Sequence, residues 1–116
     1  MKYLSDRELN KRIAERIYIG ENSIRARKGM KASTVIVISN KLRHDIAMVD
    51  YCNNWNDLMP LVDFNYEMRK TESGLFHCTV LPDWHLGDVK IGTRRAVESK
   101  TRALAECLLK VLESKK

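Results

Sequence analysis

The sequence predicts a single α+β domain in which N- and C-terminal helices pack on a small, mostly antiparallel sheet, with a short helix inserted mid-chain. Apolar residues recur at helical spacing near both ends of the chain, whereas the middle carries short β-branched runs separated by polar turns. A length of 116 residues suits one domain, and a hydrophobic fraction of 44% is enough for a packed core. We therefore expect residues 1–116 to fold as one unit.

The first helix is predicted over residues 6–18. Ser5 and Glu8 have the spacing of a capping box, in which each side chain bonds to the other residue's amide. Apolar residues then follow at helical spacing: Leu9, Ile13 and Ile17. Residues 20–33 lack apolar periodicity and carry a basic run, so we expect a flexible basic loop there.

The middle of the chain is predicted to be extended. The β-branched run Thr34–Ile38 is typical of a strand buried on both faces, and residues 46–49 form a second brief extended segment. Residues 65–69 and 75–81 flank the polar turn 70–74, which predicts a hairpin.

A last helix is predicted near the C-terminus. Its apolar stripe comprises Val97, Leu104, Leu108, Val111 and Leu112. Either Thr93 or Ser99 could cap this helix, and the sequence does not choose between them.

The run of residues 51–60 is the most distinctive part of the chain, because it combines capping residues, a tryptophan and a proline. Two interpretations are open: this motif forms a binding surface, or it specifies a buried turn. In either case the residues concerned are Tyr51, Cys52, Asn53, Asn54, Trp55, Asp57 and Pro60.

Pro60 limits where a helix in this run can begin. Inside a helix it would lack an amide donor and clash with the preceding turn, whereas in the first turn no donor is required. We therefore predict a short helix over residues 58–64 with Asp57 as its N-cap. The two asparagines before it are expected to bond the local backbone while Trp55 packs inward.

The charge is segregated along the chain. The formal net charge is +6; residues 1–31 and 90–116 each carry +5, whereas residues 32–89 carry −4. This pattern indicates either an anionic partner or ends that complement the middle of the fold. Cations at the start of the last helix oppose its dipole unless an anion binds there. The candidate anion or nucleic-acid contacts are Arg25, Arg27, Lys28, Arg94, Arg95, Lys100 and Arg102.

Several classes of function are disfavoured by the sequence. The three cysteines (Cys52, Cys78 and Cys107) have no paired spacing, which favours reduced, buried thiols in a cytoplasmic protein. No metal-ligand spacing, Gly-rich phosphate loop or acid/base pair is present, so we expect no catalytic residues, metal or cofactor. No apolar window approaches the roughly 18 residues that span a membrane, and charge begins at once, so we expect neither membrane association nor a signal peptide.

One family resemblance rests on the same distinctive run. Residues 51–62 contain Tyr, Cys-Asn-Asn-Trp, an acidic residue and a proline followed by aliphatics, and this resembles the central signature of the NinX-type small proteins of bacteriophages and prophages. Residues 9–15 and 101–109 are similar to that family's opening and closing helices, whereas residues 20–45 show no similarity. Family members usually begin the last helix with Asn-Pro, where this chain has Ser99-Lys100.

The resemblance implies a phage- or prophage-encoded accessory protein in the cytoplasm of the bacterial host, and it implies no reaction. The leading functional hypothesis is a non-catalytic protein that binds a host or phage protein. Nucleic-acid binding through the basic N- and C-terminal segments is the alternative, and an enzyme comes third. The oligomeric state stays open.

Overall fold

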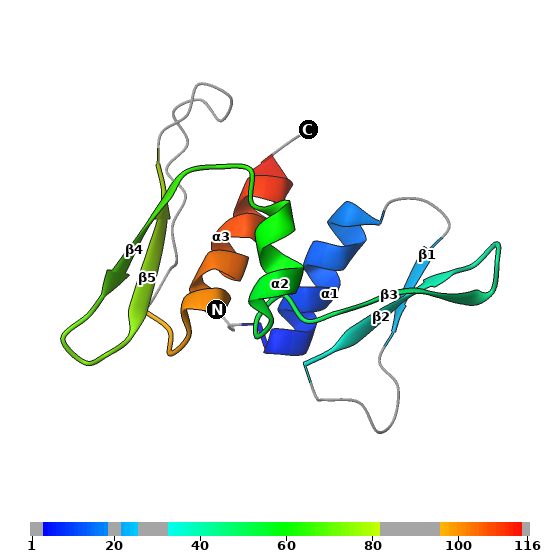
Figure 1. The fold of residues 1–116 in the computed structure, drawn as a ribbon, viewed down its shortest axis with the longest axis horizontal. Helices are drawn as coiled ribbons and strands as arrows, with labels where there is room; N and C mark the ends of the chain where they lie inside the picture. The colour runs from blue at the N-terminus through cyan, green and yellow to red at the C-terminus, as the bar shows by residue number, and fades with distance from the viewer. Residues whose placement is uncertain (1–3, 19–21, 26–32, 82–95, 115–116) are drawn as a thin grey trace.

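Helices occupy the middle of the molecule, and a small antiparallel sheet lies on each side of them (Figure 1). The computed structural model describes residues 4–18, 22–25, 33–81 and 96–114. In chain order the elements are α1 (Asp6–Ile17), β1 (Asn22–Arg25), β2 (Val35–Ser39), β3 (His44–Val49), α2 (Trp55–Leu58), the 3₁₀ helix η1 (Met59–Leu61), β4 (Tyr66–Lys70), β5 (Phe76–Val80) and α3 (Lys100–Ser114). The predicted α+β single domain is confirmed, but its strands form two sheets instead of one.

The first sheet has the strand order β1-β2-β3, with both pairs antiparallel. In β2, Val35 and Val37 belong to the main core cluster. Ile36 points away from that cluster, but it is also buried, with only 1% of its surface exposed. The predicted burial of this strand on both faces is confirmed. β1 lies within residues 20–33, where we predicted a loop, so that prediction is wrong for residues 22–25. Its four residues lack a β-branched run, and pairing with β2 makes them a strand.

The second sheet is the predicted hairpin of β4 and β5. The register pairs Tyr66 with Val80 and Lys70 with Phe76. Gly74 has a φ of 85° in the turn, a conformation that glycine adopts without steric cost. The Thr71 hydroxyl accepts a hydrogen bond from the Leu75 amide at 3.0 Å and helps to close the turn.

α1 and α3 pack against each other; α3 also covers β5, and α1 covers β1 and β2. The predicted cap of α1 is confirmed, because the Glu8 amide donates to Ser5 Oγ at 3.1 Å. Ser99 caps α3 through its Oγ, which accepts from the Arg102 amide at 3.3 Å, and Thr93 lies outside the described residues. Within the described part of the chain, no helix is long and apolar enough to cross a membrane.

Val97 does not belong to the last helix, contrary to the prediction. It forms an isolated antiparallel bridge with Phe76, with backbone N···O distances of 2.7 and 2.9 Å. Val97 is 9% exposed and belongs to the core, so its apolar character reflects this bridge and not a helical stripe. The bridge extends the hairpin towards the start of α3.

Candidate functional site

The distinctive run of residues 51–60 forms a turn, one α-helical turn and then part of a 3₁₀ turn. α2 begins at Trp55, and its N-cap is Asn54, whose Oδ1 accepts from the amide two residues ahead at 3.0 Å. The predicted start after Asp57 is therefore wrong. Pro60 is compatible with this earlier start because it occupies the first turn of η1, where no amide donor is required.

Trp55 is directed towards solvent, so its predicted inward packing is also wrong. Its exposed fraction is 41%, whereas Leu58 is fully buried and supplies the core contact of α2. Asp57 still contributes to the turn, since its Oδ2 accepts from the Asp50 amide at 3.0 Å.

Three buried polar side chains, those of Asn10, Ser33 and Asp50, form hydrogen bonds with one another and with the exposed Asn53 of this turn; we call these four residues the polar network. Asn10 Nδ2 donates to the Ser33 carbonyl and to Asp50 Oδ1, each at 2.8 Å. Asn10 Oδ1 accepts from the Cys52 amide at 3.0 Å. Ser33 Oγ donates to Asp50 Oδ2 at 2.6 Å, and Asn53 Nδ2 lies 3.1 Å from that hydroxyl. Hydrogen bonds of this kind offset the cost of removing the buried polar groups from water.

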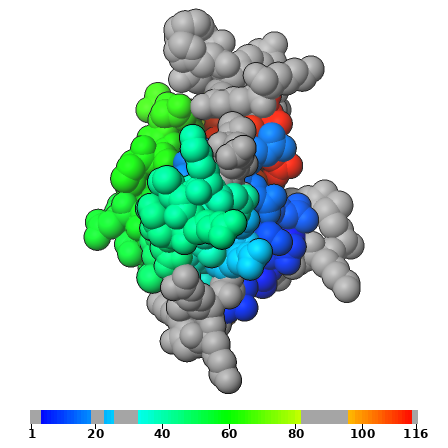
Figure 2. All heavy atoms as spheres, turned by 90° about the vertical axis from the view of Figure 1, so that its right-hand side faces the viewer, coloured from blue at the N-terminus to red at the C-terminus, as the bar shows by residue number. Residues whose placement is uncertain are grey.

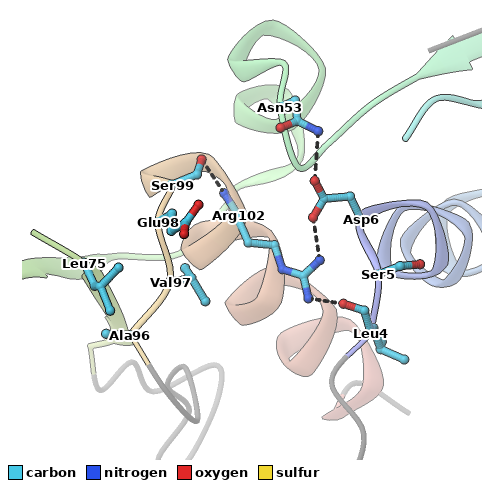
Figure 3. Close-up of a pocket in the computed structure, with 10 residues that line it drawn as sticks. All are labelled: Leu4, Ser5, Asp6, Asn53, Leu75, Ala96, Val97, Glu98, Ser99 and Arg102. Carbon is cyan, nitrogen blue, oxygen red and sulfur yellow. Dashed lines mark hydrogen bonds and ion pairs between the residues drawn. The ribbon is translucent and has the colours of Figure 1, made fainter. Parts of the chain in front are cut away.

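Arg102 links the polar network to both terminal helices (Figure 3). Its Nη1 donates to Asp6 Oδ1 at 2.7 Å, and its Nη2 donates to the Leu4 carbonyl at 2.6 Å. Asp6 Oδ2 accepts from Asn53 Nδ2 at 3.2 Å. The Arg102 side chain is 12% exposed. This predicted anion contact therefore already serves the fold.

A pocket of about 440 Å³ opens beside this guanidinium group (Figure 3). Its walls combine the start of α1, the turn before α2 and the segment that leads into α3. Asp6 and Glu98 bring negative charge to the lining, and both terminal nitrogens of Arg102 already donate to protein oxygens. We interpret this pocket as a seam between the terminal segments, because Arg102, the cation among its described lining residues, is already engaged by protein oxygens.

The three thiols and Tyr51 are core groups. Burial raises the pKa of the Cys52 thiol and of the Tyr51 hydroxyl. The pKa of the Cys107 thiol is raised by a hydrogen bond between this thiol and Cys78, and by burial. Because a thiolate is the nucleophilic form, Cys52 and Cys107 are not activated at neutral pH. The predicted burial of all three cysteines is confirmed.

A second pocket, of about 470 Å³, lies between the hairpin and the first residues of α2 and α3. We call it the aromatic groove, and it is lined by Trp55, Tyr66, Met68, Lys70, Phe76 and Lys100. Side-chain alternation along β4 places Tyr66, Met68 and Lys70 on one face of the hairpin. The β4–β5 register then sets Lys70 directly opposite Phe76.

Positive charge gathers over one ring of the aromatic groove. Lys100 Nζ lies 5.5 Å and Lys70 Nζ 6.0 Å from the centroid of the Phe76 ring. Both distances are within the range of cation–π interactions, and such interactions attract the ammonium groups to the face of the ring. Neither lysine forms an ion pair with a carboxylate of the described residues. The groove thus presents aromatic surface and unneutralised positive charge together.

A third surface is apolar and belongs to β3 and the turn before it. Leu42 and Met48 are each 62% exposed and Ile46 is 42% exposed; we call these three residues the β3 edge patch. β3 is an edge strand in the sheet order, and the β2–β3 hairpin is at the front of the face shown in Figure 2. The register shifts between Val37 and Ile38, which makes Ile46 the extra residue of a bulge.

The three predicted anion contacts that the structure describes, Arg25, Lys100 and Arg102, do not form one cationic surface. Arg25 is exposed on β1, whereas Lys100 lines the aromatic groove on the other side of the helices (Figure 1). Arg102 is engaged by Asp6. The other four predicted contacts (Arg27, Lys28, Arg94 and Arg95) lie outside the described residues.

Sequence reasoning missed most residues of the polar network and of the aromatic groove. Asn10 lies three residues before Ile13 on the buried side of α1, so a polar residue beside the predicted apolar stripe was the available signal. The alternation of Tyr66, Met68 and Lys70 in a predicted strand was the signal for the groove. Neither signal identifies the partners from the rest of the chain.

Among the described residues, no group of three or more His, Cys, Asp or Glu side chains is placed to hold a metal ion. No family model, curated protein or solved structure matches the chain. Function is therefore inferred from the surfaces of the chain itself.

Proposed function

We propose that the protein is a non-catalytic accessory protein of phage or prophage origin that acts by binding a host or phage protein. Its origin, and its action in the bacterial cytoplasm, rest on the resemblance of residues 51–62 to the NinX-type signature. Its mode of action rests on one structural observation, the β3 edge patch.

The β3 edge patch has the composition of a protein-docking surface. Most edge strands are protected by charge, proline or covering segments, because their unpaired amides and carbonyls would otherwise pair with another chain. Here the edge strand exposes Ile46 and Met48, with Leu42 in the turn beside them. Large apolar side chains exposed together on an edge strand are a feature of interaction sites.

The partner that fits this surface is an extended segment of another protein. Such a segment would add to the free edge of β3 through main-chain hydrogen bonds, and its alternate apolar side chains would cover Ile46 and Met48. The exposed pair His44 and Asp45 at the start of β3 would lie at the polar rim.

A pull-down from nuclease-treated bacterial lysate tests the proposal. The bait is the tagged full chain, compared with Met48→Lys and with Thr79→Lys as a matched control. Both positions are exposed strand residues, but Thr79 belongs to the other sheet. A specific partner should be captured by the wild type and by Thr79→Lys and lost with Met48→Lys, because a charge would be buried in the apolar contact. Equal capture by all three baits would contradict the proposed surface.

Nucleic-acid binding through the basic N- and C-terminal segments is the second candidate. Arg25 and Lys100 are both exposed and available for phosphate contacts. The same pull-down, repeated without nuclease, separates the two candidates. Nucleic acid recovered from the untreated lysate, with no protein retained after nuclease, would favour this alternative.

A further inference from the structure

We propose that the aromatic groove binds single-stranded nucleic acid, with a base stacked on its aromatic side chains and the flanking phosphates held by Lys70 and Lys100. The groove lies beside the β4–β5 hairpin, whereas the β3 edge patch belongs to the sheet on the other side of the helices (Figure 1). The inference therefore goes beyond the proposed protein-binding function and does not depend on it.

The stacking surface consists of one exposed and two half-buried aromatic side chains. Trp55 is 41% exposed at the first residue of α2 and has no role in the core cluster. Tyr66 and Phe76 are half-buried and pack against the core on their inner sides. An edge-to-face contact with the buried Phe64, at a centroid distance of 6.4 Å, also positions the Tyr66 ring. Aromatic surfaces positioned in this way accept bases without losing much conformational entropy on binding.

The charge of the groove suits a phosphodiester chain. Lys70 and Lys100 are both exposed and both lie within 6.0 Å of the Phe76 centroid, and the described residues that line the groove include no carboxylate. Lys100 is also the first residue of α3, where a cation opposes the helix dipole. A bound phosphate would turn that unfavourable interaction into a favourable one, because it meets both the ammonium and the positive helix end.

Single strands fit this chemistry better than duplexes or acidic peptides do. In a duplex the faces of the bases are stacked on one another and cannot reach Trp55. An acidic peptide would engage Lys70 and Lys100 but would leave the exposed tryptophan unused. Only an unstacked base next to a phosphate uses both features of the groove.

Fluorescence anisotropy with labelled oligo-dT and oligo-U of about 12 nucleotides tests the inference. Titrations with the full chain at about 0.05 and 0.2 M salt should give binding that weakens with salt. The double variant Lys70→Gln/Lys100→Gln should lower the affinity about 10-fold or more at the lower salt concentration. It should also reduce the logarithmic salt slope by about 1.4, since each phosphate contact contributes about 0.7 for single strands.

Two further variants separate stacking from general charge. Trp55→Ala should weaken binding about 5-fold or more and leave the salt slope unchanged, because it removes a stacking partner and no charge. Arg69→Gln is the matched control: Arg69 is exposed on the same strand, on the opposite face from Lys70, and should change the affinity less than about 2-fold. Circular dichroism and thermal melting establish that each variant is folded.

Three results would overturn the inference. One is that wild-type protein changes the anisotropy of neither oligo-dT nor oligo-U. Another is a Lys70→Gln/Lys100→Gln salt slope equal to that of the wild type. The third is that a duplex, or AMP alone, binds with the same affinity as the single strand. Met48→Lys should bind the oligonucleotides as the wild type does, so failure of the groove and failure of the β3 edge patch are distinguishable.

Discussion

Arg102 Nη1 donates to Asp6 Oδ1 at 2.7 Å and so ties the first turn of α1 to the start of α3, across 96 positions of the chain. The second oxygen of the same carboxylate accepts from Asn53 in the turn before α2. One side chain at the start of the domain thus bonds to its middle and to its end. Asn53, in the turn of the distinctive mid-chain run, therefore helps to hold the two terminal segments in place.

Substitution of Arg102 should lower the free energy of unfolding more than substitution of an exposed charged residue does. Glu106 Oε2 lies 3.7 Å from Arg102 Nε and is buried with no hydrogen-bond partner, so Arg102→Met leaves that carboxylate without its counter-ion. We expect a loss of about 3–5 kcal/mol in the free energy of unfolding, measured by urea denaturation. The double variant Arg102→Met/Glu106→Leu should regain more than half of the loss. Arg69→Met, which breaks an exposed and solvent-screened pair with Glu67, should leave the urea midpoint nearly unchanged.

Substitution of Asn10 measures how much the polar network contributes to stability. Asn10→Leu keeps the branching at Cγ on a buried face, yet it removes two hydrogen bonds donated to Asp50 and Ser33 and the acceptor of the Cys52 amide. Unsatisfied buried groups outweigh the added apolar surface, so we expect a loss of about 2–4 kcal/mol. Lys11→Leu, at the next and exposed position, should change stability by about 0.5 kcal/mol or less. A stabilising Asn10→Leu would show that the network contributes nothing.

Trp55 and Leu58 have opposite roles in α2, although the sequence suggested that tryptophan was the core residue. Leu58→Ala should cost about 2–5 kcal/mol, because the leucine side chain is fully buried. Trp55→Ala should cost about 1 kcal/mol or less, since the ring is 41% exposed and absent from the core cluster. Thermal melts of the two variants compare these losses directly. The reverse order would place the indole in the core.

Stability should fall at alkaline pH. Burial raises the folded-state pKa of Tyr51 and Cys52 above their ordinary values of 10.0 and 9.0, so the folded protein keeps protons that the unfolded chain releases. The free energy of unfolding then decreases as the pH rises above about 9, and it is unaffected by these groups below that value. Urea titrations from pH 7 to about 11 measure this slope. Tyr51→Phe should flatten it above about pH 10; an unchanged slope would assign the effect to other groups.

Local sequence features account for the elements that were predicted well. The capping box at Ser5, the helical apolar spacing that follows it and the Gly74 turn of the hairpin each depend on residues a few positions apart. β1 was missed because its strand form comes from pairing with β2, more than ten residues ahead. The start of α2 was misplaced because two capping residues, Asn54 and Asp57, compete in sequence and Pro60 is compatible with either start once η1 forms.

The candidate sites show the same division. The sequence marked residues 51–60 as a specified feature, and it identified Lys100 as a candidate anion contact. It did not show that Asn53 bonds to Asp6, or that Lys100 faces Phe76. Those contacts join segments that are distant in the chain, so no local spacing contains them.

The α+β class, the two terminal helices and the hairpin could be predicted from the sequence, because short-range periodicity and capping depend only on neighbouring residues. The division of the strands into two sheets, the exposure of Trp55 and the engagement of Arg102 by Asp6 follow from long-range packing. These outcomes depend on which long-range contacts bury apolar surface and supply hydrogen-bond partners to buried polar groups. The aromatic groove and the β3 edge patch are what that packing leaves exposed.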